Sequence, residues 1–175
     1  MVLLDSDHMS LLQRGGEPGQ RIKQRLGHLQ PDEVATTIVN YEEQMRGWLA
    51  RLARATTLDR QVSDYRELKN LLRKYCSVPV VDFDTEAAAQ FELLKRVPIR
   101  IGSMDLKIAA IALAGEATLL TRNLIDFRKV PGLRVEDWSG FLTQLQVART
   151  WRAHSRQYFR ITSLAMSCID RRTLA

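Results

Sequence analysis

The chain has 175 residues, of which 45% are hydrophobic and 26% charged, and its formal net charge is +6. This length and composition are typical of one globular domain and exclude an intrinsically disordered chain. The longest apolar runs, such as 108–114, are too short to cross a bilayer, and Asp5 and Asp7 stand where a secretory signal would be basic or apolar. We therefore expect a cytoplasmic protein without a membrane segment.

Apolar patterns in the first half of the chain predict two strands and four helices. Residues 2–4 form a short apolar run that predicts a buried strand, and residues 34–37 are a second candidate strand. Apolar residues three and four positions apart predict helices over the following ranges: 6–12, 20–29, 40–55 and 58–75. The glycine-rich segment 14–19 is expected to separate the first two helices.

The second half of the chain continues the alternation of strands and helices. Strands are predicted at 79–83, 117–121 and 133–135, and helices from Asp84 or Thr85 to Leu94 and from Ser103 to Gly115. Strands that alternate with helices favour a parallel sheet. We expect a three-layer α/β fold, in which a central, mostly parallel sheet of four to five strands has helices on both faces.

Several common site types have no support in this sequence. There is no phosphate-binding glycine loop, no nucleophile elbow and no zinc pattern among the two cysteines. The three histidines, His8, His28 and His154, lack ligand spacing. Carboxylates are therefore the residues left as candidates for the chemistry.

Four acidic residues are expected at or near strand ends: Asp5, Glu43, Asp105 and Asp126. Asp5 ends the first strand, and Glu43 and Asp105 are placed in the first turns of two helices. Because ligands bind at the carboxyl ends of parallel strands, these side chains should converge. Oxygen ligands without histidine or cysteine favour Mg²⁺ or Mn²⁺, which can activate water against a phosphate.

Each acid also has a purely structural interpretation. Asn40 and Glu43 have the spacing of a capping box, which would close the start of a helix. Asp105 would stabilise a helix N-terminus through the helix dipole. Asn123 and Asp126 have the spacing of an Asx turn. Spacing alone leaves these alternatives open.

Four segments, taken in order, resemble the PIN-domain family and, within it, the VapC-like toxins of type II toxin–antitoxin systems. They are Leu3-Leu4-Asp5-Ser6-Asp7, Glu43-Gln44-Met45-Arg46-Gly47, the stretch 102–110 around Asp105, and the stretch 120–127 followed by Pro131-Gly132-Leu133. The resemblance covers residues 1–138 and implies a PIN-like nuclease domain over that range.

The resemblance implies a metal site and assigns residues to it. Asp5, Glu43 and Asp105 would be catalytic metal ligands. The family's fourth acidic position falls at Asn123, where many members have Asp, and Asp126 is a nearby replacement, so the presence of a second metal stays open. Ser103 and Thr121 would be neutral ligands or hydrogen-bond donors beside the acids.

The implied activity is cleavage of RNA phosphodiester bonds by water that Mg²⁺ or Mn²⁺ activates. The implied partners are an RNA substrate, a cognate antitoxin protein and a second copy of the chain in a homodimer. We expect the helices at 40–55 and 58–75 to provide the protein contacts, because their apolar faces exceed the needs of one small core.

Two alternatives remain from the sequence. One is a degenerate PIN domain that binds RNA or a protein partner without catalysis, which Asn123 supports. The other is a phosphoacceptor receiver-type domain, which also gathers acids at strand ends. That domain would need adjacent acids near the start and a late lysine, whereas Asp5 and Asp7 are not adjacent and the late strand ends in Thr121-Arg122. The receiver-type alternative is therefore disfavoured.

The positive charge is concentrated at the C-terminal end. Residues 1–138 contain 20 Lys and Arg and 19 Asp and Glu, whereas residues 139–175 contain six Arg and one acid, Asp170. We expect residues 139–175 to be a basic C-terminal extension, helical or partly disordered. The segment is either a loosely attached extension without a function of its own or an RNA-binding arm. In the second case the arginines at 149, 152, 156 and 160, which are spaced as one stripe of a helix, would contact RNA phosphates.

Overall fold

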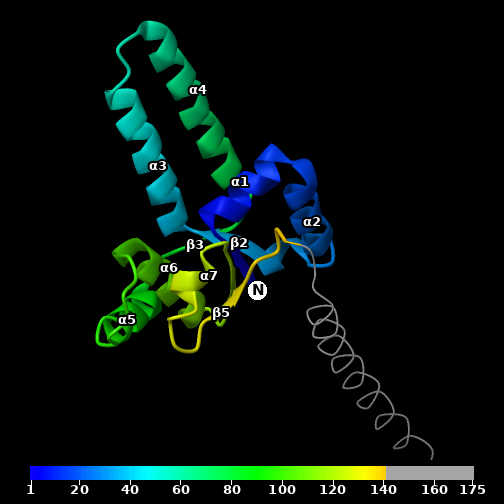
Figure 1. The fold of residues 1–175 in the computed structure, drawn as a ribbon, viewed down its shortest axis with the longest axis vertical. Coiled ribbons are helices and arrows are strands. Elements are labelled where there is room, and N and C mark those ends of the chain that lie inside the picture. The colour runs from blue at the N-terminus through cyan, green and yellow to red at the C-terminus, as the bar shows by residue number, and fades with distance from the viewer. Residues whose placement is uncertain (141–175) are drawn as a thin grey trace, which may run out of the picture. The chain divides into compact units, whose positions relative to one another are not determined.

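A five-stranded parallel sheet forms the centre of the computed structural model, which describes residues 1–140 (Figure 1). The strands are β1 (Val2–Leu4), β2 (Val34–Thr37), β3 (Val80–Val81), β4 (Thr118–Leu120) and β5 (Arg134–Glu136). Their order across the sheet is β3-β2-β1-β4-β5, and every neighbouring pair is parallel. This architecture confirms the expected α/β fold with a parallel sheet.

Seven α-helices and one 3₁₀ turn connect these strands in the described residues. The helices are α1 (Ser6–Arg14), α2 (Gly16–Leu26), α3 (Ile38–Ala53), α4 (Leu58–Tyr75), α5 (Thr85–Leu94), α6 (Ser103–Ala114) and α7 (Leu124–Phe127), and the 3₁₀ turn is Pro31–Glu33. Helices α2 and α3 begin earlier than the periodicity predicted. Among the described residues, no helix combines the length and the apolar character needed to cross a membrane.

The two faces of the sheet are covered by different helices because neighbouring residues of a strand point to opposite sides. Leu3 and Leu119 are fully buried in a cluster that includes Ala109 and Ile111 of α6. Their neighbours Leu4 and Leu120 pack in a second cluster. That second cluster contains residues of α1, α2 and α4: Met9, Ile22, Leu71 and Tyr75. Helices on both faces give the expected three layers.

Glycines allow α1 and α2 to form a tight pair. Gly15 and Gly16 have φ angles of 70° and 69°, a conformation that residues with a Cβ rarely adopt. At Gly19, a Cβ would lie 2.5 Å from the carbonyl oxygen of Leu11. The chain therefore interrupts the helix only at Gly15 and resumes it at Gly16, so the predicted break over 14–19 is too long.

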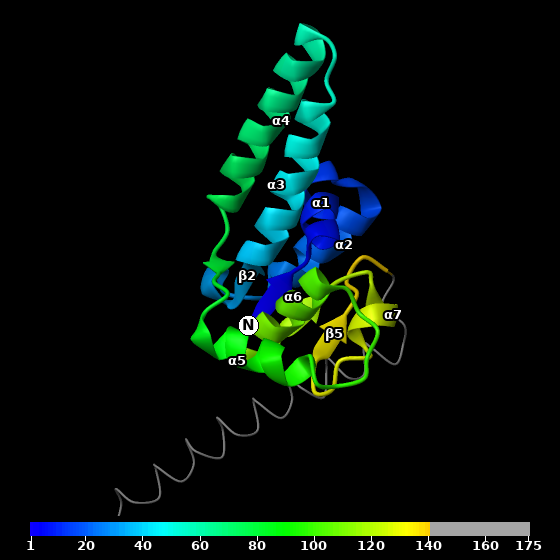
Figure 2. The same cartoon turned by 90° about the vertical axis from the view of Figure 1, so that its left-hand side faces the viewer.

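Helices α3 and α4 form an antiparallel hairpin that extends away from the sheet (Figures 1 and 2). The apolar residues of α4 divide between two sides of the helix. Leu68 and Leu71 pack inward, whereas Val62, Tyr65 and Leu72 are more than half exposed. The single apolar face predicted for this helix is therefore only partly buried.

The predicted basic extension at 139–175 lies, apart from its first two residues, outside the described part of the chain. Ser139 belongs to the described domain. Its carbonyl oxygen accepts a 2.8 Å hydrogen bond from Nε of Arg21 in α2, and its hydroxyl donates to Asp137. The chain is therefore held against α2 up to this residue.

Candidate active site

Asp5 is held at the carboxyl end of β1 by residues from three neighbouring segments. Its Oδ1 accepts hydrogen bonds from the Ser6 backbone N–H at 2.6 Å and from Nδ2 of Asn40 at 2.7 Å. Its Oδ2 accepts a 2.6 Å hydrogen bond from the Thr121 hydroxyl. Burial raises the pKa of Asp5 in spite of these donors, and the charge of Asp7 raises it further. The carboxylate is thus fixed in orientation but costly to ionise.

Glu43 and Asp105 approach Asp5 closely enough for their charges to interact. Burial raises the pKa of Glu43 to about 7, with further contributions from the charges of Asp5, Asp105 and Glu42. Burial also raises the pKa of Asp105, with contributions from Asp5 and Asp126. Mutual repulsion of this kind is expected when carboxylates share one site without a cation.

Asp105 and Glu43 are positioned by the starts of α6 and α3, and the start of α3 differs from the prediction. Asp105 lies in the first turn of α6, as predicted. Thr37, and not Asn40, caps α3, because the Thr37 hydroxyl accepts from the Asn40 N–H at 3.1 Å. Glu43 therefore lies in the second turn of α3. The capping-box interpretation of Asn40 and Glu43 is wrong, so Glu43 has no helix-capping role.

Asn123 and Asp126 are paired with each other and with a lysine. Nδ2 of Asn123 donates to Oδ2 of Asp126 at 3.1 Å, across the short helix α7. Nζ of Lys129 donates to the other oxygen, Oδ1, at 2.5 Å. These hydrogen bonds lower the pKa of Asp126, the largest contribution coming from Lys129. The expected contact between the two residues is present, but in a helix and not in an Asx turn.

The two neutral candidates are placed differently. Thr121 is fully buried, donates to Asp5 and accepts a 3.1 Å hydrogen bond from the Asn123 N–H. Ser103, the first residue of α6, is exposed. Thr121 thus contacts an acid of the site directly, and no contact of this kind is described for Ser103.

Asn40 is a site residue that the sequence did not reveal. Its side chain is fully buried and donates to Asp5 and, at 3.2 Å, to the Ser6 hydroxyl. Its Oδ1 accepts a 2.5 Å hydrogen bond from the Thr37 hydroxyl. In the sequence Asn40 resembled a helix cap, and no local signal pointed to a contact with Asp5. Its amide links α3 to the end of β1.

Asp7 and His8 form a second polar network beside Asp5. Oδ2 of Asp7 accepts from the Arg122 N–H at 2.9 Å, and Oδ1 lies 2.9 Å from Nδ1 of His8. Nε2 of the fully buried His8 accepts a 3.1 Å hydrogen bond from the Trp138 N–H, so Nδ1 carries the proton and donates to Asp7. Although burial acts to raise it, these donors hold the pKa of Asp7 below its usual value. The network ties α1 to the segments that follow β4 and β5.

Tyr75, in the last turn of α4, places a hydroxyl group under the acids. The residue is 6% exposed, and within the described residues its hydroxyl makes no hydrogen bond of normal geometry, although the Ser6 and Thr36 hydroxyls lie close enough to lower its pKa. Burial raises its pKa, and the charges of Asp5 and Glu43 act in the same direction. Tyr75 therefore places a buried polar group beside the end of β1, within reach of the charges of Asp5 and Glu43.

The donor set is compatible with a hard divalent cation. Asp5, Glu43 and Asp105 offer carboxylate oxygens only, and a cation would offset the repulsion that raises their pKa values. Within the described residues, no three acidic, histidine or cysteine side chains surround a single point at ligand distance. The acids therefore share one region without being drawn together around one centre.

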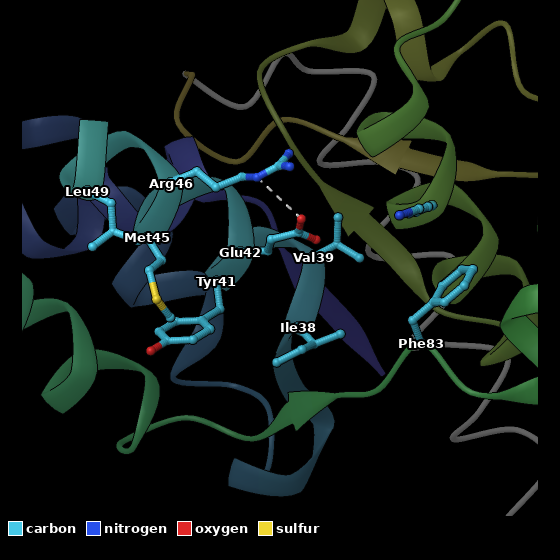
Figure 3. A pocket seen from close by; sticks show the side chains of 9 residues that line it. Ile38, Val39, Tyr41, Glu42, Met45, Arg46, Leu49 and Phe83 are labelled. Atoms are coloured by element: carbon cyan, nitrogen blue, oxygen red, sulfur yellow. Dashed lines mark ion pairs between the residues drawn. The ribbon is translucent and has the colours of Figure 1, made fainter. Parts of the chain in front are cut away.

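A mostly apolar pocket of about 410 Å³ lies beside this region (Figure 3). It is lined by Ile38, Val39, Tyr41, Glu42, Met45, Arg46 and Leu49 of α3 together with Phe83 and Lys107. Glu42 and Arg46 form a 3.5 Å ion pair at its edge (Figure 3). None of the three central acids lines it, so the pocket adjoins the acidic region without containing it.

Comparison with known proteins identifies relatives of this domain. The PIN domain family profile matches residues 2–133. Ribonuclease VapC2 of Rickettsia felis is 36% identical over 63 residues, or 34% of this chain and 47% of that protein. The tRNA(fMet)-specific endonuclease VapC of Salmonella typhimurium is 35% identical over 63 residues, or 34% and 48%. The matched region thus spans about half the length of these curated relatives.

A solved structure shares the fold at greater coverage. The structure of VapBC2 from Rickettsia felis bound to a promoter DNA fragment aligns with a TM-score of 0.60 and 20% sequence identity. The alignment covers 79% of this chain and 99% of that one. At this identity the likeness establishes the fold.

Proposed function

This chain belongs to the PIN-domain family, and we propose that it is a metal-dependent endoribonuclease, the toxin of a toxin–antitoxin pair. The observation that carries the proposal is the electrostatic coupling of the three acids: beside burial, the charge of Asp5 raises the pKa values of both Glu43 and Asp105, and the charge of Asp105 also raises that of Glu43. Shared perturbation of this kind is typical of functional sites. RNA is the proposed substrate because two curated relatives are named as RNA-cleaving enzymes.

Mg²⁺ or Mn²⁺ is the proposed cofactor, with Asp5, Glu43 and Asp105 as ligands. When bound, such an ion activates water and neutralises charge at the phosphate that is attacked. The hydrogen bonds from Asn40 and Thr121 would keep the two oxygens of Asp5 in a fixed orientation toward it. Thr121 and Ser103 remain proposed neutral groups beside the ion.

One ion is assigned to Asp5, Glu43 and Asp105, and a second ion would have to bind at Asn123 and Asp126. Asp126 already accepts hydrogen bonds on both oxygens, from Asn123 and Lys129. The ammonium group of Lys129 would also repel a cation, so this ion pair would have to open for Asp126 to bind one. The presence of Asn123 and Lys129 at this position therefore favours a single strongly held ion.

The proposed protein partners are a cognate antitoxin and a second copy of the chain. The antitoxin is supported by the likeness to a toxin–antitoxin complex. The exposed apolar side chains of α4, among them Leu58 and Val62 at 78% and 59% exposure, support the α3–α4 hairpin as a contact surface. With RNA as substrate, the expected place of action is the cytoplasm.

A second candidate function is a PIN domain that binds RNA or a protein without cleaving it. The observation that favours it is the neutral Asn123 at the fourth acidic position together with the capture of Asp126 by Lys129. Both candidates predict RNA or protein binding. Only the first predicts cleavage that depends on the three acids.

The test is cleavage of total RNA by the purified full-length chain, with Mg²⁺ or Mn²⁺ and with a chelator. We expect cleavage with metal only, and none by Asp5→Asn, which keeps the shape of the side chain but removes its charge. A Glu86→Gln variant, changed at an exposed acid of α5, is the control for loss of one negative charge. Cleavage by Asp5→Asn at the wild-type rate would reject the assignment, and absence of cleavage by the wild type would favour the binding function.

A further inference from the structure

Three arginines meet at the far end of the α3–α4 hairpin. Arg51 and Arg54 come from the end of α3, and Arg60 comes from the first turn of α4. With Ala55, Ser63 and Asp64 they line a pocket of about 310 Å³. Figures 1 and 2 show the loop between the two helices at the end of the hairpin that is away from the sheet. We call this pocket the hairpin tip.

Helical spacing explains why these side chains share a pocket. Residues three and four apart lie on one face of a helix. Arg51 in the last turn of α3 is followed by Arg54 at the C-cap, three residues on, and Arg60, Ser63 and Asp64 have this spacing on α4. Because the two helices are antiparallel neighbours, these two faces oppose each other at the hairpin tip.

The positive charge at the hairpin tip is only partly neutralised. Nη2 of Arg51 lies 3.1 Å from Oδ1 of Asp64, whose side chain is 8% exposed. Arg54 donates from Nε to the Ala50 carbonyl at 2.9 Å, and within the described residues neither Arg54 nor Arg60 has an acidic partner. Both guanidinium groups are exposed. Two arginines are therefore available to bind an anion.

The hairpin tip has the donors that an oxyanion requires, and the proposed RNA substrate makes phosphate the anion that we consider. Guanidinium groups present planar pairs of N–H donors that match phosphate oxygens. The guanidinium of Arg51 also lies 4.6 Å from the centre of the Trp48 ring, a cation–π contact that holds Arg51 at the edge of the pocket.

The acidic centre makes such an anchor necessary if the substrate is RNA. Asp5, Glu43 and Asp105 repel phosphates until a cation binds, and residues 1–138 have a net charge of only +1. From Glu43 to Arg51 and Arg54 the distance along α3 is about 12–16 Å, at ~1.5 Å per residue. That distance spans only a few nucleotides of an RNA strand. One RNA strand can therefore reach both places.

We propose that the hairpin tip is a phosphate-binding site that anchors the RNA backbone while the scissile phosphate lies at the acids. This inference rests on the proposed function for the identity of the ligand. It adds a substrate contact that is remote from the metal-binding residues and does not read sequence, because phosphate contacts set position and not base identity.

The test is binding of a fluorescein-labelled, unstructured single-stranded RNA to the full chain. An Asp105→Asn background prevents cleavage. In this background we compare two double variants. The hairpin-tip pair carries Arg54→Gln and Arg60→Gln, and the control pair carries Arg66→Gln and Arg96→Gln. The control pair removes the same charge from exposed arginines outside the hairpin tip, one of them on α4. Arg51 is kept, since its loss would leave the buried Asp64 without its counter-ion.

We expect the hairpin-tip pair to bind RNA about tenfold or more weakly at low salt than the control pair. The slope of log affinity against log salt should become shallower by roughly 1.4, at ~0.7 per phosphate contact. Arg54→Lys with Arg60→Lys keeps the charge, so it should lose affinity while retaining the slope. This variant also covers the case in which the glutamine pair does not fold.

Equal RNA binding by the hairpin-tip and control pairs would overturn the inference. Binding of polyglutamate, a model for an acidic protein, is measured in parallel. Normal RNA binding by the hairpin-tip pair together with loss of polyglutamate binding would also overturn the inference, because the ligand would then be an acidic protein. The proposed nuclease function fails separately, if the unmodified chain with metal does not cleave RNA. A chain that binds RNA through the hairpin tip without cleaving it would keep this inference and reject the nuclease.

Discussion

The hydroxyl group of Thr121 donates a 2.6 Å hydrogen bond to Oδ2 of Asp5. Thr121 follows β4 and Asp5 follows β1, so this bond joins the ends of the two central strands at the proposed metal site. Thr121 also accepts from the Asn123 N–H. One buried hydroxyl therefore links an acid of the site to the segment that carries the neutral fourth position.

Replacing Thr121 by Val should destabilise the protein at neutral pH. The variant removes the donor to a buried ionised oxygen, which costs about 1–3 kcal/mol, and it should raise the pKa of Asp5 further. Thr121→Ser keeps the hydroxyl and should retain most of the stability. Urea unfolding measures both variants. Equal stability of Thr121→Val and the wild type would show that this hydrogen bond contributes nothing net.

The metal-free protein should be more stable near pH 5 than at neutral pH. The pKa of Glu43 rises from 4.5 to about 7 on folding, and those of Asp5 and Asp105 also rise. The folded state then binds more protons than the unfolded state, so stability is lost as the pH increases from about 4.5 to about 7. Because Glu43 is partly exposed, solvent screening limits its effect to about 1 kcal/mol.

Glu43→Gln should flatten this pH dependence, because glutamine does not titrate. Unfolding of wild type and Glu43→Gln at a series of pH values in chelator checks the expectation. Glu86→Gln, at an exposed position, should leave the profile unchanged. A wild-type stability that increases over this pH range would show that the acids are not strained in the metal-free fold.

Mg²⁺ or Mn²⁺ should raise the melting temperature of the wild type, because an ion that binds only the folded state stabilises it by mass action. Asp105→Asn should make the metal-free protein at least as stable, since it removes one repelling charge, and should abolish cleavage. Its metal-induced shift should also shrink. The measurement is thermal unfolding with and without metal, together with RNA cleavage. Full cleavage by Asp105→Asn would make its assignment as a catalytic ligand wrong.

Tyr75→Phe should leave the metal-free protein as stable as the wild type or more stable, by up to about 1 kcal/mol. The reason is that the buried hydroxyl makes no hydrogen bond of normal geometry among the described residues and interacts only weakly with the Ser6 and Thr36 hydroxyls, so phenylalanine mainly removes the cost of burying it. Leu71→Ala, a large cavity at a 5% exposed neighbour, is the positive control for destabilisation. Loss of stability in Tyr75→Phe would reveal a hydrogen bond that the hydroxyl makes in solution.

The local pattern of the sequence predicts most elements but only part of the site. The strand at residues 34–37 and the helices at 58–75 and 103–114 were predicted to within one residue, because each has local boundary signals. The start of α3 was predicted two residues late, since β2 runs directly into the helix and its last residue, Thr37, is also the cap. No spacer residue marks the boundary.

Contacts between distant residues account for what the sequence did not predict. Asn40 meets Asp5 across 35 positions, and His8 meets Trp138 across 130. Neither pair has a spacing that periodicity can detect, because the strand order of the sheet brings them together. The ion pair between Asp126 and Lys129 is local, because the two residues are three positions apart. Whether Asp126 could instead bind a metal ion depends on its distance from Asp105, which lies far from it in the sequence.

Four arginines, at 149, 152, 156 and 160, lie outside the described residues, and their helical spacing predicts that they contact RNA. Truncation after Gly140 keeps the Ser139 carbonyl that Arg21 binds. Loss of about four phosphate contacts should make the slope of log affinity against log salt shallower by roughly 3, at ~0.7 per contact. Cleavage at saturating RNA should survive, because all proposed metal ligands precede residue 127. An unchanged slope would reject RNA binding by this segment and leave the hairpin tip as the proposed anchor. A truncated chain that does not fold would instead show that the segment is needed for folding of the domain.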